Sequence, residues 1–261
     1  MSTRIDACIA LFALTVVVAA CGSPSPESSP APAAAPDAAP AAAPAPAAPL
    51  PGDSVITGSV KFEGTAPTPR VVRMDSDPLC MVEGPGTSEV LVVGPGNGVQ
   101  NTFVYVKDGL GDRTFPAPQT PVVLDQRGCK YTPHVFGAQV GQPVTIVNSD
   151  PTLHNIHAVP KANAEFNFGQ AMKGMKTTRT FDKPEVMVPF RCDVHGWMAS
   201  YGGILSHPFF AVSNADGSFQ IKGLPAGTYT IEAWHERLGT QTQKVTVDGK
   251  GPGKVGFAFK G

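Results

Sequence analysis

Short runs of apolar and β-branched residues, bounded by Gly, Pro or Asn, recur along most of the chain. Residues 55–62, 103–106, 144–147 and 229–234 are examples. No long segment repeats its apolar residues at the 3.6-residue period of an amphipathic helix. Short strands with regular turn signals between them are typical of β-sandwiches. The pattern therefore predicts an all-β fold from about residue 53 to the last residue.

The N-terminal residues do not follow this pattern. Residues 7–20 form an apolar run after Arg4 that is too short to span a bilayer, so residues 1–20 are predicted to be a signal peptide. The run ends in Val-Ala-Ala-Cys-Gly, with the Cys at position 21. This resembles the lipobox of bacterial lipoproteins, in which that Cys carries the lipid. An ordinary cleavage site with an incidental Cys is the alternative.

Residues 21–52 consist almost entirely of Ala, Pro and Ser. Such a segment has too little branched apolar surface to form a core, and we expect a disordered tether. A lipid on Cys21 would anchor the mature protein to a membrane without spanning it. We expect a location on the periplasmic side, at the outer membrane of a Gram-negative bacterium.

The strongest chemical signal is Cys192-x2-His195-x2-Met198, with His154 lying 38 residues before Cys192. Two imidazoles, one thiolate and one weak thioether are the ligands of blue-copper electron-transfer sites. The alternatives are a structural Cys beside a His, or a zinc site. Zinc usually takes more Cys ligands in structural sites and no thioether. The pattern therefore favours one copper ion.

These residues resemble the metal-site motif of the cupredoxins, and the ligand loop resembles the short loop of the amicyanins. The resemblance covers about residues 120–206 and implies a Greek-key β-sandwich at 116–206 with one type 1 copper. It implies that the ligands are His154, Cys192, His195 and Met198. Asn155 matches the residue that ties the His loop to the Cys loop and shields the thiolate. Gly196 and Trp197 depart from the residues usual in that loop.

The resemblance also implies a function and an electron port. The exposed edge of His195 would pass single electrons to a periplasmic or membrane redox protein, such as a cytochrome or an oxidoreductase. An apolar docking patch around it would contain Pro151, Leu153, Gly196 and Trp197; a buried Trp197 is the alternative. The protein is thus expected to be a carrier and not an enzyme. Copper storage or delivery, or an accessory role in a copper redox enzyme, are the alternatives.

Composition argues against two other classes. The chain has 20 Lys and Arg against 21 Asp and Glu, and it has no basic run. A nucleic-acid partner is therefore not expected. Only six His are present, and no His-x-His pair occurs among them. This argues against a multicopper oxidase.

A second resemblance lies near the C-terminus. Residues 215–231 read as a turn, a strand, a Gly-Pro turn and a strand, and they resemble the carboxypeptidase regulatory-like domain, a small transthyretin-like β-sandwich. Residues 207–261 alone are too few for a sandwich. We expect residues 53–115 to supply the missing strands, with 116–206 inserted between the two parts. In the alternative, tandem order, residues 53–115 belong to the copper domain.

The remaining Cys and His have several interpretations. Cys80 and Cys129 are expected to pair in an oxidising compartment. A second metal site that uses Cys129 and His134, or two free thiols, are the alternatives. His157 follows His154 by three residues, so on a strand the two side chains face opposite sides. We expect structural roles for His134, His157, His207 and His235. A second copper site formed by some of them is the alternative.

Overall fold

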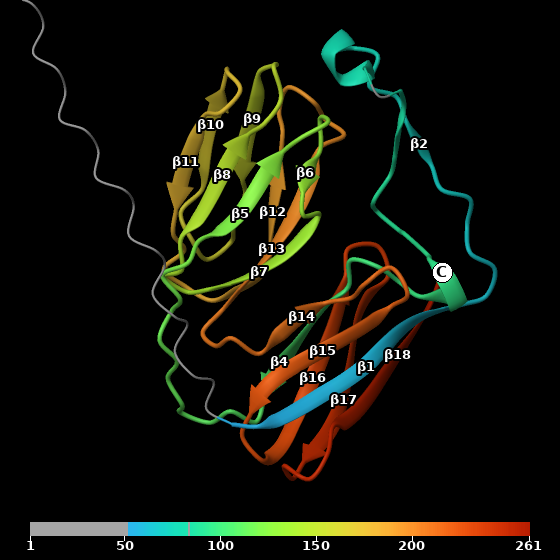
Figure 1. Cartoon of the computed structure of the whole chain (residues 1–261), viewed down its shortest axis with the longest axis vertical. Coiled ribbons are helices and arrows are strands. Elements are labelled where there is room, and N and C mark those ends of the chain that lie inside the picture. The colour runs from blue at the N-terminus through green and yellow to red at the C-terminus, as the bar shows by residue number, and fades with distance from the viewer. Residues whose placement is uncertain (1–51, 83) are drawn as a thin grey trace, which may run out of the picture. The chain divides into compact units, whose positions relative to one another are not determined.

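The computed structural model describes residues 52–82 and 84–261, in which strands dominate (Figure 1). The all-β fold class is confirmed. The predicted signal peptide, the lipidation site at Cys21 and all of the predicted tether (21–52) except its last residue lie outside the described residues. Within the described part of the chain, no helix has the length and apolar character needed to cross a bilayer.

One sandwich is built from strands at both ends of the described chain. Its strands are β1 (Ser54–Glu63), β4 (Phe103–Asp108), β14 (Phe210–Val212), β15 (Ser218–Leu224), β16 (Gly227–His235), β17 (Gly239–Val247) and β18 (Gly253–Lys260). The three-stranded sheet has the order β15-β1-β18, and the four-stranded sheet has the order β14-β4-β16-β17. β1 is antiparallel to β15 and parallel to β18, while β4 is antiparallel to β14 and β16. This is the pairing that a discontinuous sandwich requires.

The alternation of side chains along these strands explains how the first sandwich forms its core. Residues of β18 are alternately buried and exposed, as expected when successive side chains point to opposite faces of a sheet. The buried members pack with those of β1 and β16. The core includes Ile56, Val60, Phe219, Ile231, Phe257 and Phe259.

The second sandwich contains the strands between these two parts, drawn from green to orange in Figure 1. They are β5 (Val122–Gln126), β6 (Tyr131–Thr132), β7 (Val135–Gln139), β8 (Val144–Asn148), β9 (His154–Ala158), β10 (Phe166–Gln170), β11 (Lys176–Arg179), β12 (Glu185–Arg191) and β13 (Ala199–Leu205). The sheets have the orders β10-β9-β12-β13-β7 and β11-β8-β5-β6. Their shared core includes Leu124, Ile146, Ile156, Val188 and Phe190.

The segment between β1 and β4 corrects one predicted boundary. It contains β2 (Val71–Val72), the 3-10 helix η1 (Pro78–Met81), β3 (Gly86–Thr87) and the 3-10 helix η2 (Pro95–Asn97). Met74 and Cys80 are buried in the core of the second sandwich, and Cys80 forms a disulfide with Cys129. Only part of residues 53–115 therefore belongs to the discontinuous sandwich. The part that contains Met74 and Cys80 packs against the second, inserted sandwich.

Two buried histidines outside the copper motif have structural roles. His207 Nδ1 accepts a hydrogen bond from the Phe209 N–H at 3.2 Å, and His235 Nδ1 accepts from the N–H groups of Arg237 and Leu238 at 3.2 and 3.3 Å. A ring nitrogen that accepts a hydrogen bond carries no proton, so both imidazoles are neutral. Burial lowers the pKa of both from 6.5 to about 4.

We therefore expect stability to fall as the pH is lowered from about 6.5 to 4. Each His takes up its proton in the unfolded chain near pH 6.5 but in the folded protein only near pH 4, so acid favours unfolding in this window. The loss is on the order of 3 kcal/mol per histidine. Urea unfolding at several pH values measures it. In His207→Asn, whose amide oxygen can still accept from Phe209, the slope in this window should be about half as steep.

Candidate metal centre

His154 is the first residue of β9, and side-chain hydrogen bonds fix the turn that leads to it. The Asn148 side-chain amide donates to the carbonyl oxygens of Thr152 and Gln170, both at 2.8 Å. The Asp150 N–H donates back to Asn148 Oδ1 at 2.9 Å. β9 pairs with β10 on one side and β12 on the other. The His154 side chain is therefore held in the interior, where it is fully buried.

The loop between β12 and β13 carries the other three expected ligands. The Cys192 N–H donates to the Met198 carbonyl at 3.3 Å, and the Met198 N–H donates to the His195 carbonyl at 2.9 Å. The His195 N–H points at Cys192 Sγ, 3.3 Å away. Cys192, His195 and Met198 are each 2% exposed. Seven residues thus present a thiol, an imidazole and a thioether from one compact, buried loop.

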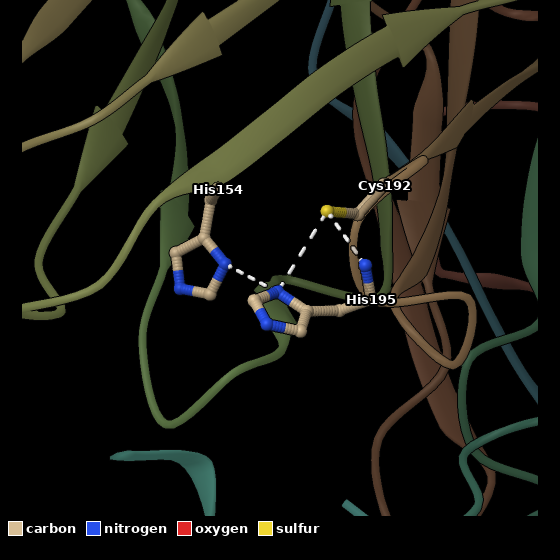
Figure 2. A group of neighbouring side chains, drawn as sticks. All are labelled: His154, Cys192 and His195. Carbon is tan, nitrogen blue, oxygen red and sulfur yellow. Dashed lines mark hydrogen bonds between the residues drawn. The ribbon is translucent and has the colours of Figure 1, made fainter. Parts of the chain in front are cut away.

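Figure 2 shows that the His154, Cys192 and His195 side chains converge. The Nδ1 atoms of the two imidazoles are 3.1 Å apart, and Cys192 Sγ is 3.9 Å from His195 Nδ1. One ligand atom from each of the three residues lies within 4.8 Å of the others. Two imidazole nitrogens and a thiolate, with a buried thioether on the same loop, fit copper better than zinc, calcium or magnesium.

Asn155 joins the strand that carries His154 to the ligand loop. Its N–H donates to Cys192 Sγ at 3.4 Å, and its side-chain oxygen accepts from the Asp193 N–H at 2.9 Å. These two contacts are those expected of a residue that ties the loops together and covers the sulfur.

The surroundings of Cys192 favour the thiolate, which is the form that binds metals. Burial by itself would raise the pKa of the thiol. The His154 imidazole and the N–H groups of Asn155 and His195 outweigh burial, so the pKa of Cys192 is lowered. The hydrogen-bond donors around the sulfur therefore favour its anionic form.

A carboxylate lies against the outer nitrogen of each imidazole, and neither carboxylate was predicted from the sequence. His154 Nε2 is 2.8 Å from Asp150 Oδ2, and His195 Nε2 is 3.1 Å from Asp77 Oδ2. Burial would raise the pKa of both carboxyl groups, but hydrogen bonds outweigh it and lower the pKa of both, so they are ionised. The bond from Asp150 raises the pKa of His154 to about 9 despite its burial.

The predicted electron port at His195 is wrong. A segment of residues 74–82, called here the capping segment, covers the imidazole: Asp77 contacts its Nε2, and Cys80 Sγ lies 3.8 Å from the same atom. The edge is closed because the Cys80–Cys129 disulfide fixes the capping segment over it. The resemblance could not show this, because the capping segment lies outside the residues that it covers.

The predicted docking patch is only partly exposed. Pro151, Leu153 and Gly196 are at the surface, whereas Trp197 is half-buried. The Trp197 indole N–H donates to the Cys129 carbonyl at 3.1 Å, and its ring centroid lies 5.0 Å from that of His195. Trp197 therefore packs beside the site, neither fully exposed nor fully buried.

The other histidines lie apart from the three converging ligands. His157 contacts Asp193 and Glu165, at 3.0 and 2.7 Å. His134 bonds the Ala199 carbonyl at 3.0 Å and the Glu236 carboxylate. Among the described residues, no group with metal-binding geometry contains either of them. The alternative second site with Cys129 is also wrong, because Cys129 is held in the disulfide.

Several solved structures are similar to part of the chain. One is a copper-containing nitrite reductase from Thermus scotoductus SA-01, at 22% identity and a TM-score of 0.32, covering 38% of this chain. This chain spans about a quarter of that protein, 25%. Another is a variant of amicyanin, at 20% identity and a TM-score of 0.29, covering 45% of this chain and 93% of amicyanin.

A third is a purple cupredoxin from Nitrosopumilus maritimus, at 19% identity and a TM-score of 0.28, covering 33% of this chain and 98% of that protein. No protein-family model matches the chain. No curated protein matches it. The chemistry of the site is therefore deduced from its own side chains.

Proposed function

We propose that the protein is a type 1 copper protein that carries single electrons. One observation carries the proposal: the Cys192 sulfur and the inward Nδ1 atoms of His154 and His195 converge in the interior, and Met198 is buried on the same loop as Cys192 and His195. Bound copper would supply the Cu(I)/Cu(II) couple, and the Met198 thioether, as a weak ligand, would tune its potential.

The chain's contribution is to hold these donors in place. Backbone hydrogen bonds close the ligand loop on itself, and Asn155 ties the loop to β9. Donors that are fixed by the fold move little when the charge of the metal changes, which suits rapid electron transfer. The discontinuous sandwich, formed from parts of 53–115 and 207–261, would act as a scaffold of the carboxypeptidase regulatory-like type.

The partner is inferred to be a periplasmic or membrane redox protein, such as a cytochrome or an oxidoreductase. Apolar side chains at the surface near the ligands support this: Leu79 in the capping segment, Leu153 beside His154 and Val194 beside His195 are 48%, 44% and 50% exposed. Exposed apolar groups close to a buried redox site are suited to brief docking. Anchoring through a lipid on Cys21 would keep the protein on the periplasmic side.

A redox titration of the copper-loaded full chain tests the proposal. We expect each copper to accept one electron from a mild reductant and to return it to an oxidant over repeated cycles, without loss of metal. The main alternative is copper delivery, and burial of all four donors argues against ready exchange. Transfer of the copper to a Cu(I) chelator after the first reduction would contradict the carrier and favour delivery.

A further inference from the structure

Each imidazole of the site contacts a carboxylate through its outer nitrogen, Nε2. Their Nδ1 atoms face each other at 3.1 Å, so the Nε2 atoms point away from the metal position. There, Nε2 of His154 meets Asp150 at 2.8 Å, and Nε2 of His195 meets Asp77 at 3.1 Å. A carboxylate only accepts, so each Nε2 carries a proton, and Nδ1 is the nitrogen of each ring that faces the metal position.

Asp150 is itself held in place by the backbone. Its two carboxylate oxygens accept from the N–H groups of Gly128 and Cys129, both at 2.8 Å. These residues form the turn between β5 and β6, and Cys129 is the disulfide partner of Cys80. The turn that orients His154 is thus covalently linked to the segment that covers His195.

Hydrogen bonds also fix the Asp77 carboxylate, although Asp77 belongs to an irregular segment. Its Oδ1 accepts from the Leu79 N–H at 2.9 Å and so caps η1. Its Oδ2 accepts from the Thr152 hydroxyl at 2.8 Å, two residues before His154. The side chain is 18% exposed. A partly buried carboxylate with two fixed donors is well placed to orient the imidazole.

We propose that Asp77 and Asp150 are positioning residues of the copper site. They hold both imidazoles with Nδ1 toward the metal and increase the electron donation of each ring, which favours Cu(II) over Cu(I). This inference rests on the proposed function, and it adds the capping segment to the metal site. The disulfide then serves the site, because it fixes the segment that supplies one of the two carboxylates.

Asp77→Asn in the copper-loaded full chain is the main test. The Asn oxygen can still cap η1. Its NH2 group then faces the N–H of His195 Nε2 and cannot accept a hydrogen bond from it. We expect Cu(II) affinity to fall about 10- to 100-fold. Cu(I) should be affected less, so the reduction potential rises. Each tenfold difference between the two losses corresponds to about 59 mV.

Two control variants separate this role from simpler ones. Asp75→Asn removes the same charge from an exposed side chain two residues away and should change neither affinity nor potential. Thr152→Val removes the other contact of Asp77 Oδ2 while leaving the carboxylate against His195. If Asp77→Asn does not fold, Asp77→Ser retains a capping oxygen but no carboxylate, and it should raise the potential in the same way.

The outcomes distinguish this inference from the function on which it rests. A wild-type protein without a thiolate-to-copper absorption band would overturn the proposed function itself. A wild-type protein with that band, together with Asp77 variants whose potential and Cu(II) affinity match those of Asp75→Asn, would overturn the positioning role alone.

Discussion

Cys192→Ser abolishes the intense visible absorption of the copper-loaded protein. Cys192 is the only free cysteine among the described residues, and its sulfur faces both His154 and His195. Its lowered pKa makes the thiolate available, whereas a serine hydroxyl remains protonated near neutral pH and is a poor soft donor. Absorption spectra of the two proteins at equal copper content measure the effect, which we expect to be complete loss of the band.

Met198→Leu is the matched control for this experiment. It alters the same buried loop but leaves the thiolate and both imidazoles intact. We expect the band to remain and the reduction potential to shift, since a weak thioether ligand tunes the potential without creating the colour. An intense band that persists in Cys192→Ser would refute the ligand assignment.

Removal of the disulfide is expected to have the largest effect on stability. In Cys80→Ala/Cys129→Ala the crosslink over a sequence separation of 49 is lost. Loop entropy in the unfolded chain then predicts a loss of about 4 kcal/mol. The capping segment also loses its covalent tie to the turn beside Asp150, so His195 should become accessible. Urea unfolding of the metal-free protein measures the first effect.

The second effect has its own measurement. In the double variant, a small reagent that modifies imidazole should reach His195 in the metal-free protein, whereas in the wild type it should not. Thr152→Val serves as a control in which the disulfide remains and the segment stays in place. A double variant with wild-type stability and a protected His195 would show that the disulfide does not fix the cap.

Local patterns were sufficient to predict the strands and the ligand loop. Cys192, His195 and Met198 fall within seven residues, so one short loop presents them together whatever the rest of the chain does. His154 joins them because β9 and β12 are hydrogen-bonded neighbours, with Arg191 opposite His157. The strand-like runs on either side of the loop and before His154 predicted the strands that bring these residues together.

The capping segment could not be predicted in this way. Asp77 meets His195 across a sequence separation of 118, from a stretch without periodic pattern. The available signal was Cys80: its pairing with Cys129 brings the segment to the second sandwich. That pairing alone does not indicate which side chain covers the imidazole. The edge of His195 was therefore predicted to be exposed, and this prediction was wrong.

The most direct test of the copper site is the combined absorption and EPR spectrum of the copper-loaded wild-type protein. One equivalent of Cu(II) should give a strong thiolate-to-copper band in the visible region and narrow copper hyperfine splitting. Both are expected if the Cys192 thiolate and the two imidazoles hold the copper ion. A colourless protein that prefers zinc, or a Cu(II) spectrum without the thiolate band, would contradict the account.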